Sequence, residues 1–143
     1  MITLPKLYQI AQEQNIAVDC FVLHSREALS VMDEDGRCFI AIDPYQLRSD
    51  QDERMKLAHE LGHCVTGSFY NRYAAVDCRQ RHENCADKWA ILRLISANDL
   101  QDAVNRGITE PWELAEHFDL PEHFVRKAIH YYTHGNLASD GLF

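Results

Sequence analysis

The spacing of apolar residues predicts a helix at the start of the chain, short strands after it, and mainly helices from residue 50 onward. Apolar side chains recur every three or four positions over residues 3–15, which indicates an amphipathic helix. Residues 19–42 contain short apolar runs on both sides of Asp33-Glu34-Asp35-Gly36, a pattern typical of strands joined by a hairpin. Helical spacing returns in three later stretches, which are residues 50–66, 82–97 and 98–133. We therefore expect one α+β domain over residues 1–143, with a short N-terminal antiparallel sheet packed on a helical bundle.

The helix predicted over residues 50–66 has both start and stop signals. Ser49 and Asp50 are each followed three positions later by an acidic residue, and Gly67 follows the last turn. Gly62 lies in the interior, where glycine costs about 1 kcal/mol relative to alanine, so we expect close packing against a neighbouring element there. One apolar stripe runs along this helix and consists of Met55, Ala58, Leu61, Gly62 and Val65.

The opposite edge of the same helix carries the run His59-Glu60-Leu61-Gly62-His63. Residues four apart share a helix face, so the two imidazoles can bind one metal ion. Glu60 lies about 100° round the helix from His59, where it can take a proton from the water that the ion activates. The run predicts a zinc-dependent peptidase, with His59 and His63 as ligands and Glu60 as general base. Zinc is the usual ion at such a site, and the spacing alone also admits Mn²⁺ or Fe²⁺.

A catalytic zinc site takes three protein ligands, and we choose Glu83 as the third. Glu83 and Asp87 are four apart in the next predicted helix and therefore share a face. We expect Asp87 to orient a histidine ligand through its second ring nitrogen. The alternative is a solvated first turn, where the helix dipole favours acidic residues. Other candidate ligands lie on other faces or on the preceding loop, and these are Asp77, Cys78, His82 and Cys85.

Residues 67–80 are polar and aromatic, which predicts a loop between the two helices of the site. A tyrosine hydroxyl near the metal could stabilise the oxyanion formed when water attacks the peptide carbonyl. Tyr70 and Tyr73 are the candidates. The alternative, which we favour, is that both aromatic rings simply pack.

Three stretches of the chain, read together, give a more specific picture. They are Ile40-Ala41-Ile42-Asp43, Glu53-Arg54-x-x-x-Ala58-His59-Glu60-Leu61-Gly62-His63, and Glu83-x-x-Ala86-Asp87-x-x-Ala90-x-x-Leu94. This combination resembles the gluzincin-like ImmA/IrrE-type metallopeptidases of bacteria and their mobile elements. The resemblance implies a small zincin-like domain, zinc bound by His59, His63 and Glu83, and Glu60 as base. It also implies a protein substrate, a helix-turn-helix repressor of a phage, a mobile element or a stress regulon.

The strand at residues 38–42 leads towards the helix that carries the histidines. In such peptidases the strand above the cleft binds the substrate backbone by strand addition. The order of elements along the chain therefore assigns this role to the segment around Ile40 and Ile42.

The last predicted helices raise an alternative function. Thr109 can cap a helix that has Pro111 in its first turn and includes Trp112 in its apolar face, and Leu120-Pro121 forms a turn before another helix. Such a pair resembles a helix-turn-helix unit. The fixed cations on its second helix are only Arg126 and Lys127, which favours a packing role over reading DNA.

Composition favours a cytoplasmic protein with a basic protein partner. The formal net charge of −8 opposes direct binding to nucleic acid, and a DNA-binding repressor is a basic partner that it would attract. The five cysteines are odd in number and fit no tight disulfide framework, which suits a reducing compartment. Membrane spans and a signal-peptide core are not expected. Two alternatives to the peptidase are a catalytically silent metal-binding module that binds a repressor, and a helix-turn-helix DNA-binding regulator.

Overall fold

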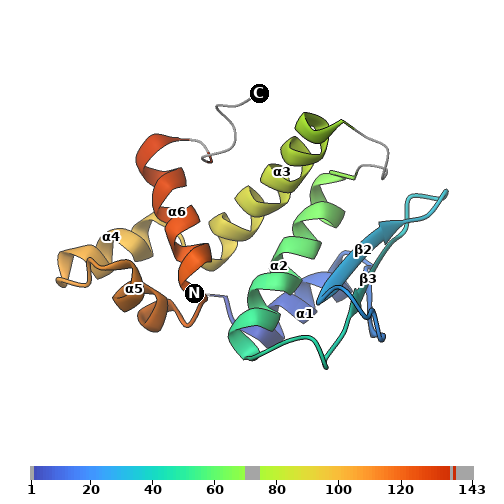
Figure 1. Cartoon of the computed structure of the whole chain (residues 1–143), viewed down its shortest axis with the longest axis horizontal. Helices are drawn as coiled ribbons and strands as arrows, with labels where there is room; N and C mark the ends of the chain where they lie inside the picture. Colours follow the sequence, from blue (N-terminus) through green and yellow to red (C-terminus); the bar gives the residue numbers. More distant parts are fainter. Residues whose placement is uncertain (1, 70–74, 136, 138–143) are drawn as a thin grey trace.

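The computed structural model describes residues 2–69, 75–135 and 137. Within these residues the chain forms a three-stranded sheet and six helices, which confirms the α+β class (Figure 1). The elements in chain order are α1 (Leu4–Glu13), β1 (Ala17–Cys20), β2 (Ala28–Met32), β3 (Cys38–Ile42), α2 (Asp50–Thr66), α3 (Val76–Leu94), α4 (Ala97–Asn105), α5 (Pro111–Phe118) and α6 (Glu122–His134).

The sheet has the strand order β1-β3-β2 and is mixed, whereas the sequence predicted an antiparallel sheet. β2 and β3 pair antiparallel as a hairpin, and the backbone amide of Asp33 donates to the carbonyl of Arg37 across the turn. Gly36 has a φ of 83°, which a residue with a side chain rarely adopts. β1 pairs parallel with β3, so the connection from β1 to β2 crosses over to the far side of β3. Apolar runs in the sequence indicate where strands form, but they do not determine which strands lie next to each other in the sheet.

The central position of β3 contradicts the role that the sequence assigned to it. Both edges of β3 are paired with other strands, and Ile40 and Ile42 are buried. β3 therefore cannot accept an added strand. The outer edge of β2 is the one that faces the cleft described below, and in the described part of the chain no strand pairs with it.

Helix α2 begins and ends where the sequence predicts. The Ser49 side chain accepts a hydrogen bond from the amide of Asp52, and Gly67 ends the helix in the left-handed conformation at a φ of 68°. The predicted apolar stripe is buried except for Val65, which is 41% exposed. Val65 stands in the last turn of α2, on a side of the helix that the core does not cover.

Helices α2 and α3 approach each other closely at Gly62. A Cβ at this position would lie 2.6 Å from the carbonyl oxygen of Ala86 and 2.9 Å from its Cα. The close packing expected from an interior glycine is therefore confirmed. Since these contacts are with the backbone of α3, no change of rotamer can relieve them.

Helix α3 begins at Val76, so the predicted loop over residues 67–80 is too long by five residues. No glycine or proline interrupts residues 75–94, and the helix packs along α2. Glu83 consequently lies about two turns inside α3. The alternative interpretation of Glu83 as a solvated first-turn residue is wrong.

The C-terminal helices depart from the prediction in two details. Glu110 caps α5 in a reciprocal arrangement with Glu113, in place of the predicted Thr109. Trp112 is 55% exposed and does not belong to the apolar face of α5. It stands beside Pro111 in the first turn, where the chain has just entered the helix. The remaining apolar face of α5 is buried and comprises Leu114, Ala115 and Phe118.

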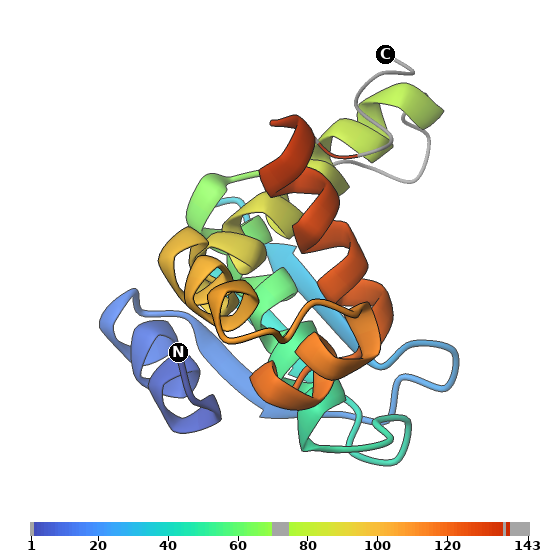
Figure 2. The ribbon, with the colours of Figure 1, turned by 90° about the vertical axis from the view of Figure 1, so that its left-hand side faces the viewer.

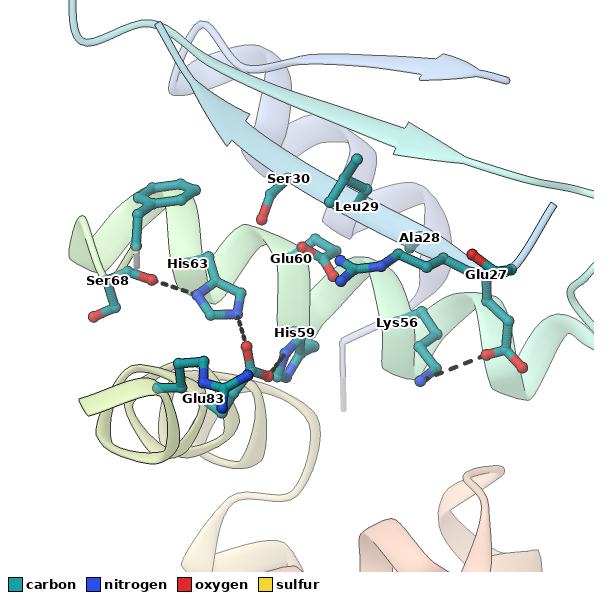
Figure 3. A pocket seen from close by; sticks show the side chains of 14 residues that line it. Glu27, Ala28, Leu29, Ser30, Lys56, His59, Glu60, His63, Ser68 and Glu83 are labelled. Carbon is teal, nitrogen blue, oxygen red and sulfur yellow. Dashed lines mark hydrogen bonds and ion pairs between the residues drawn. The ribbon is translucent and has the colours of Figure 1, made fainter. Parts of the chain in front are cut away.

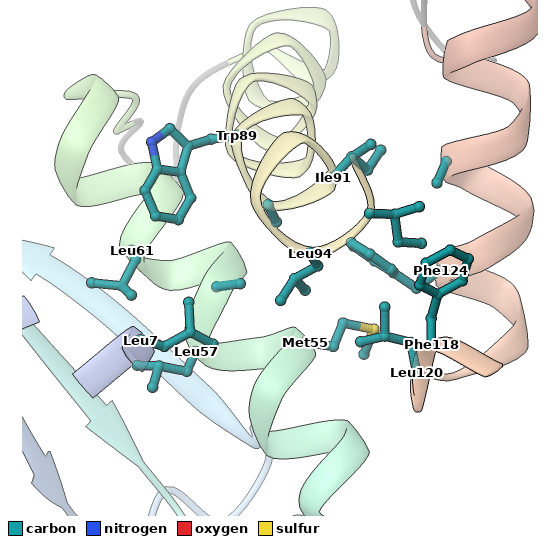
Figure 4. Packing of buried hydrophobic residues seen from close by; sticks show 14 of the residues in the cluster. Leu7, Met55, Leu57, Leu61, Trp89, Ile91, Leu94, Phe118, Leu120 and Phe124 are labelled. Atoms are coloured by element: carbon teal, nitrogen blue, oxygen red, sulfur yellow. The ribbon is translucent and has the colours of Figure 1, made fainter. Parts of the chain in front are cut away.

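Helix α2 lies between the sheet and α3, so it has apolar contacts on two sides (Figure 1). In Figure 2, α4, α5 and α6 face the viewer and the sheet lies behind them. Figure 4 shows Leu7, Leu57 and Leu61 on the sheet side, and Ile91 and Phe124 where α3 meets α6. All five side chains are at most 2% exposed. This packing fixes α2 and α3, the two helices that carry the predicted ligands.

A disulfide links Cys38 at the start of β3 to Cys64 in α2, with a Cα–Cα distance of 5.8 Å. The sequence predicted no disulfide framework, and this expectation is wrong for this pair. The two residues are 26 positions apart, and their approach results from the packing of α2 on the sheet. The cysteine pattern therefore no longer supports a reducing compartment.

Among the described residues, every helix is too short or too polar to cross a bilayer.

Candidate metal centre

The structure brings the three predicted ligands together between α2 and α3 (Figure 3). The Nε2 atom of His59 lies 2.8 Å from Glu83 Oε2, and the Nε2 atom of His63 lies 3.1 Å from Glu83 Oε1. One potential ligand atom from each residue lies within 4.8 Å of the other two. The alternative ligands His82 and Cys85 do not belong to this group.

The second ring nitrogen of each histidine is held by a hydrogen-bond acceptor. His59 Nδ1 donates to Asp87 Oδ1 at 2.7 Å, as the sequence predicted. His63 Nδ1 donates to the backbone carbonyl of Ser68, just beyond the end of α2. Both bonds place a hydrogen on Nδ1 and leave Nε2 to face Glu83. Metal-binding histidines are oriented by such partners, so both rings are already set for one ion.

Lys127 extends this network in a way that the sequence does not reveal. Its Nζ atom lies 2.9 Å from Asp87 Oδ2, so α6 contacts the same carboxylate that orients His59. Lys127 is 40 positions beyond Asp87, and only the packing of α6 brings it here. Asp87 is buried, so its carboxylate has lost contact with water. The hydrogen bonds from His59 and Lys127 compensate for this loss.

The pKa values of the site show how strongly these groups are coupled. Burial lowers the pKa of His59, but hydrogen bonds to Asp87 and Glu83 outweigh burial and raise it to about 10. Burial raises the pKa of Glu83, but hydrogen bonds from His59 and His63 outweigh burial and hold it well below its usual value. The carboxylate is therefore ionised, and the imidazoles attract protons. A cation can take the place of those protons, because metal binding and proton loss are linked.

The donor set itself fits a divalent metal ion. Two imidazole nitrogens and one carboxylate oxygen converge from two packed helices, which is the ligand combination of one class of catalytic zinc site. A site of this class keeps one position open for water or substrate. The open side here faces a cleft.

The cleft has a volume of about 700 Å³ and runs along α2 beneath β2. Glu60 lines it and is 9% exposed. Figure 3 shows His63 and Ser68 at one end of the cleft, and Lys56 and Glu27 at the other. The lining residues are Ser25, Arg26, Glu27, Ala28, Leu29, Ser30, Lys56, His59, Glu60, His63, Ser68, Phe69, Arg79 and Glu83.

Asp43 fixes the loop at one rim of the cleft. Its side chain is fully buried and accepts hydrogen bonds from the amides of Leu23 and Tyr45, at 2.9 and 3.0 Å. The Asp43 amide donates to the carbonyl of Glu27. These bonds hold residues 23–27, which supply three residues of the lining.

Tyr70 and Tyr73, the candidate oxyanion stabilisers, lie outside the described residues. Arg79 lines the cleft but was missed, because the sequence placed it in a loop. The available signal was its spacing, since Arg79 is four positions before Glu83 and shares its helix face.

We expect Asp87→Asn to lower the affinity for zinc by about 10- to 100-fold, because the orienting carboxylate of His59 is lost. Competition with a chromogenic chelator measures this affinity. Asp102→Asn is the matched control, since it makes the same chemical change at an exposed position on α4. Equal zinc affinity for Asp87→Asn and the control would show that Asp87 does not orient a ligand.

Comparison with models of protein families matches residues 14–130 to Peptidase M78, described as the IrrE N-terminal-like domain. The matched segment covers well over half of the chain and includes the sheet, α2 and α3. Comparisons with curated proteins and with solved structures give no match.

Proposed function

Because this chain belongs to the IrrE N-terminal-like domain family of peptidases, we propose that it is a zinc-dependent endopeptidase. The observation that carries the proposal is the convergence of His59, His63 and Glu83 on one point beside Glu60 in an open cleft. A site that only bound metal would not need a carboxylate such as Glu60 next to the ligands.

Different residues of the chain have different roles in the proposed hydrolysis. When bound, zinc supplies Lewis-acid chemistry, which polarises the scissile carbonyl and acidifies a water molecule. His59, His63 and Glu83 would hold the ion, and Asp87 and the Ser68 carbonyl keep the two rings in place. Glu60 takes the proton of the attacking water and passes it to the leaving amine.

We propose that the substrate adds as a strand to the outer edge of β2. Ala28, Leu29 and Ser30 of β2 line the cleft above Glu60 (Figure 3), and among the described residues no strand pairs with that edge of the sheet. Strand addition requires an extended segment, so the cleaved bond must lie outside regular helices. Peptide bound to Glu60→Gln protein should slow hydrogen exchange in β2, and unchanged exchange would contradict this binding mode.

As substrate we propose a helix-turn-helix repressor. The support is the resemblance of the three sequence stretches and the formal net charge of −8, which attracts a basic DNA-binding protein. Direct DNA binding by α5 and α6 has little support. Arg126 forms an ion pair with Glu122 at 2.9 Å, and Lys127 is engaged with Asp87.

The test is metal-dependent cleavage in a purified system. Zinc-loaded protein should cut a repressor encoded beside it at one bond, which mass spectrometry of the fragments would locate. Chelator should abolish cleavage, and added zinc should restore it. Failure to retain zinc after reconstitution of well-folded protein would overturn the proposal.

A further inference from the structure

Arg79 is a charged side chain in the cleft that the proposed hydrolysis does not use. Its Nε atom is buried and has no hydrogen-bond partner among the residues that the structure describes. A buried donor of a charged group is costly to leave unpaired, because it has lost water without gaining an acceptor. The cost is removed if a ligand supplies the acceptor.

The packing of α2 on α3 locates Arg79 along the cleft. His59 contacts both Asp87 and Glu83, whereas His63, one turn later on α2, contacts Glu83. The two helices therefore run in opposite directions, and Arg79 lies beyond Glu83 at the His63 end. Four helical residues span about 6 Å, so Arg79 is displaced along the cleft from the metal ligands.

Charge at this end of the cleft favours an anion. The lining as a whole has three carboxylates and three fixed cations, but these opposite charges are not spread evenly along the cleft. Lys56 lies 3.5 Å from Glu27 at the opposite end, and Glu83 is held by the two imidazoles. The cleft residues at the His63 end include the uncharged Ser68 and Phe69, which both contact His63. A divalent ion would add further positive charge to the cleft.

We propose that Arg79 binds a carboxylate of the substrate, in a subsite that it forms with Ser68 and Phe69. The proposal rests on the proposed peptidase function, since it concerns the choice of substrate in the same cleft. A guanidinium matches a carboxylate well, because its planar donors can make two parallel hydrogen bonds. A strand advances about 3.3 Å per residue, so the carboxylate belongs within about two residues of the scissile bond. Its source is an acidic side chain or the C-terminus of a peptide.

The experiment uses synthetic peptides of one neutral sequence, with a single Glu moved along the chain and Gln at the same position for comparison. Each peptide is made with a free and with an amidated C-terminus. Cleavage is measured with the full zinc-loaded chain, and binding by calorimetry with the Glu60→Gln variant. We expect one Glu position, or the free C-terminus, to improve both binding and kcat/KM.

Substitutions at Arg79 then test whether this residue causes the preference for a peptide with a carboxylate. Arg79→Gln should weaken binding of the preferred peptide by about 10- to 100-fold and leave the Gln peptide unchanged. Arg79→Glu should reverse the preference towards a Lys peptide. Arg81→Gln is the matched control, because it removes the same charge at an exposed position two residues along α3.

The outcomes separate the two proposals. Loss of the preference in Arg79→Gln alone supports the subsite, and amidation shows which carboxylate is bound. The subsite proposal is overturned if Arg79→Gln lowers kcat equally for every peptide. It is also overturned if the preference for the Glu peptide survives both Arg79 substitutions. If wild-type protein binds Glu peptides selectively but cleaves none, the subsite stands and the peptidase function fails.

Discussion

Glu60→Gln is expected to lower the rate of peptide hydrolysis by about 10²- to 10⁴-fold and to leave the zinc content unchanged. The amide has nearly the shape of the carboxylate but cannot accept the proton of the attacking water. Glu60 is not one of the three residues whose donor atoms converge, so its replacement leaves the ligand set intact. Elemental analysis gives the zinc content, and fragment formation from the cleaved substrate gives the rate.

Two further variants serve as controls for Glu60→Gln. His59→Ala should lose both zinc and cleavage, because it removes a ligand and one of the two partners of Asp87. Glu116→Gln makes the same chemical change as Glu60→Gln at an exposed position on α5 and should alter neither. Undiminished cleavage by Glu60→Gln would remove Glu60 from the mechanism. A protein that binds zinc but is inactive even as wild type would instead be the silent metal-binding module.

Gly62→Ala is expected to destabilise the protein by about 1–3 kcal/mol, opposite to the usual effect of this change within a helix. Helix propensity alone would stabilise the variant by about 1 kcal/mol. The new methyl carbon would lie 2.6 Å from the Ala86 carbonyl oxygen, so α2 and α3 must move apart. Chemical denaturation measures the free energy of unfolding.

The same change should also weaken zinc binding, because the movement separates His59 and His63 on α2 from Glu83 on α3. Val65→Ala on the exposed side of α2 is the control, and it should change the unfolding free energy by less than about 0.5 kcal/mol. Since the contact is with backbone, Ala86→Gly should not rescue Gly62→Ala. A Gly62→Ala variant that is more stable than wild type would show that the helices are not packed this closely.

The errors in the sequence-based predictions have a common physical origin. Local patterns located the β2–β3 hairpin and the start of α2, since turn glycines, capping residues and apolar spacing act within a few positions. They did not locate the start of α3, because helix α3 gains stability by packing along α2 rather than from a side-chain cap on Ala75. The Cys38–Cys64 disulfide and the contact of Lys127 with Asp87 were missed for the same reason.

The strand proposed to bind substrate changed from β3 to β2, because the sequence does not show how the strands pair. The order of elements favoured β3 as the strand that binds substrate, since it leads into α2. The structure gives β3 two partners and leaves the outer edge of β2 beside Glu60. Which edge remains open depends on the β1–β3 pairing, and the hydrophobic pattern does not contain that pairing.

The sequence by itself determined which candidate ligands share a helix face. The His59-Glu60-x-x-His63 spacing places two imidazoles on one helix face, and Glu83 and Asp87 share a face of another, because helical geometry is local. The tertiary structure decided which groups meet. It set Glu83 against both imidazoles, left the edge of β2 over the cleft and placed Arg79 in its lining, because these contacts join segments that only the packing of α2 on the sheet and on α3 brings together.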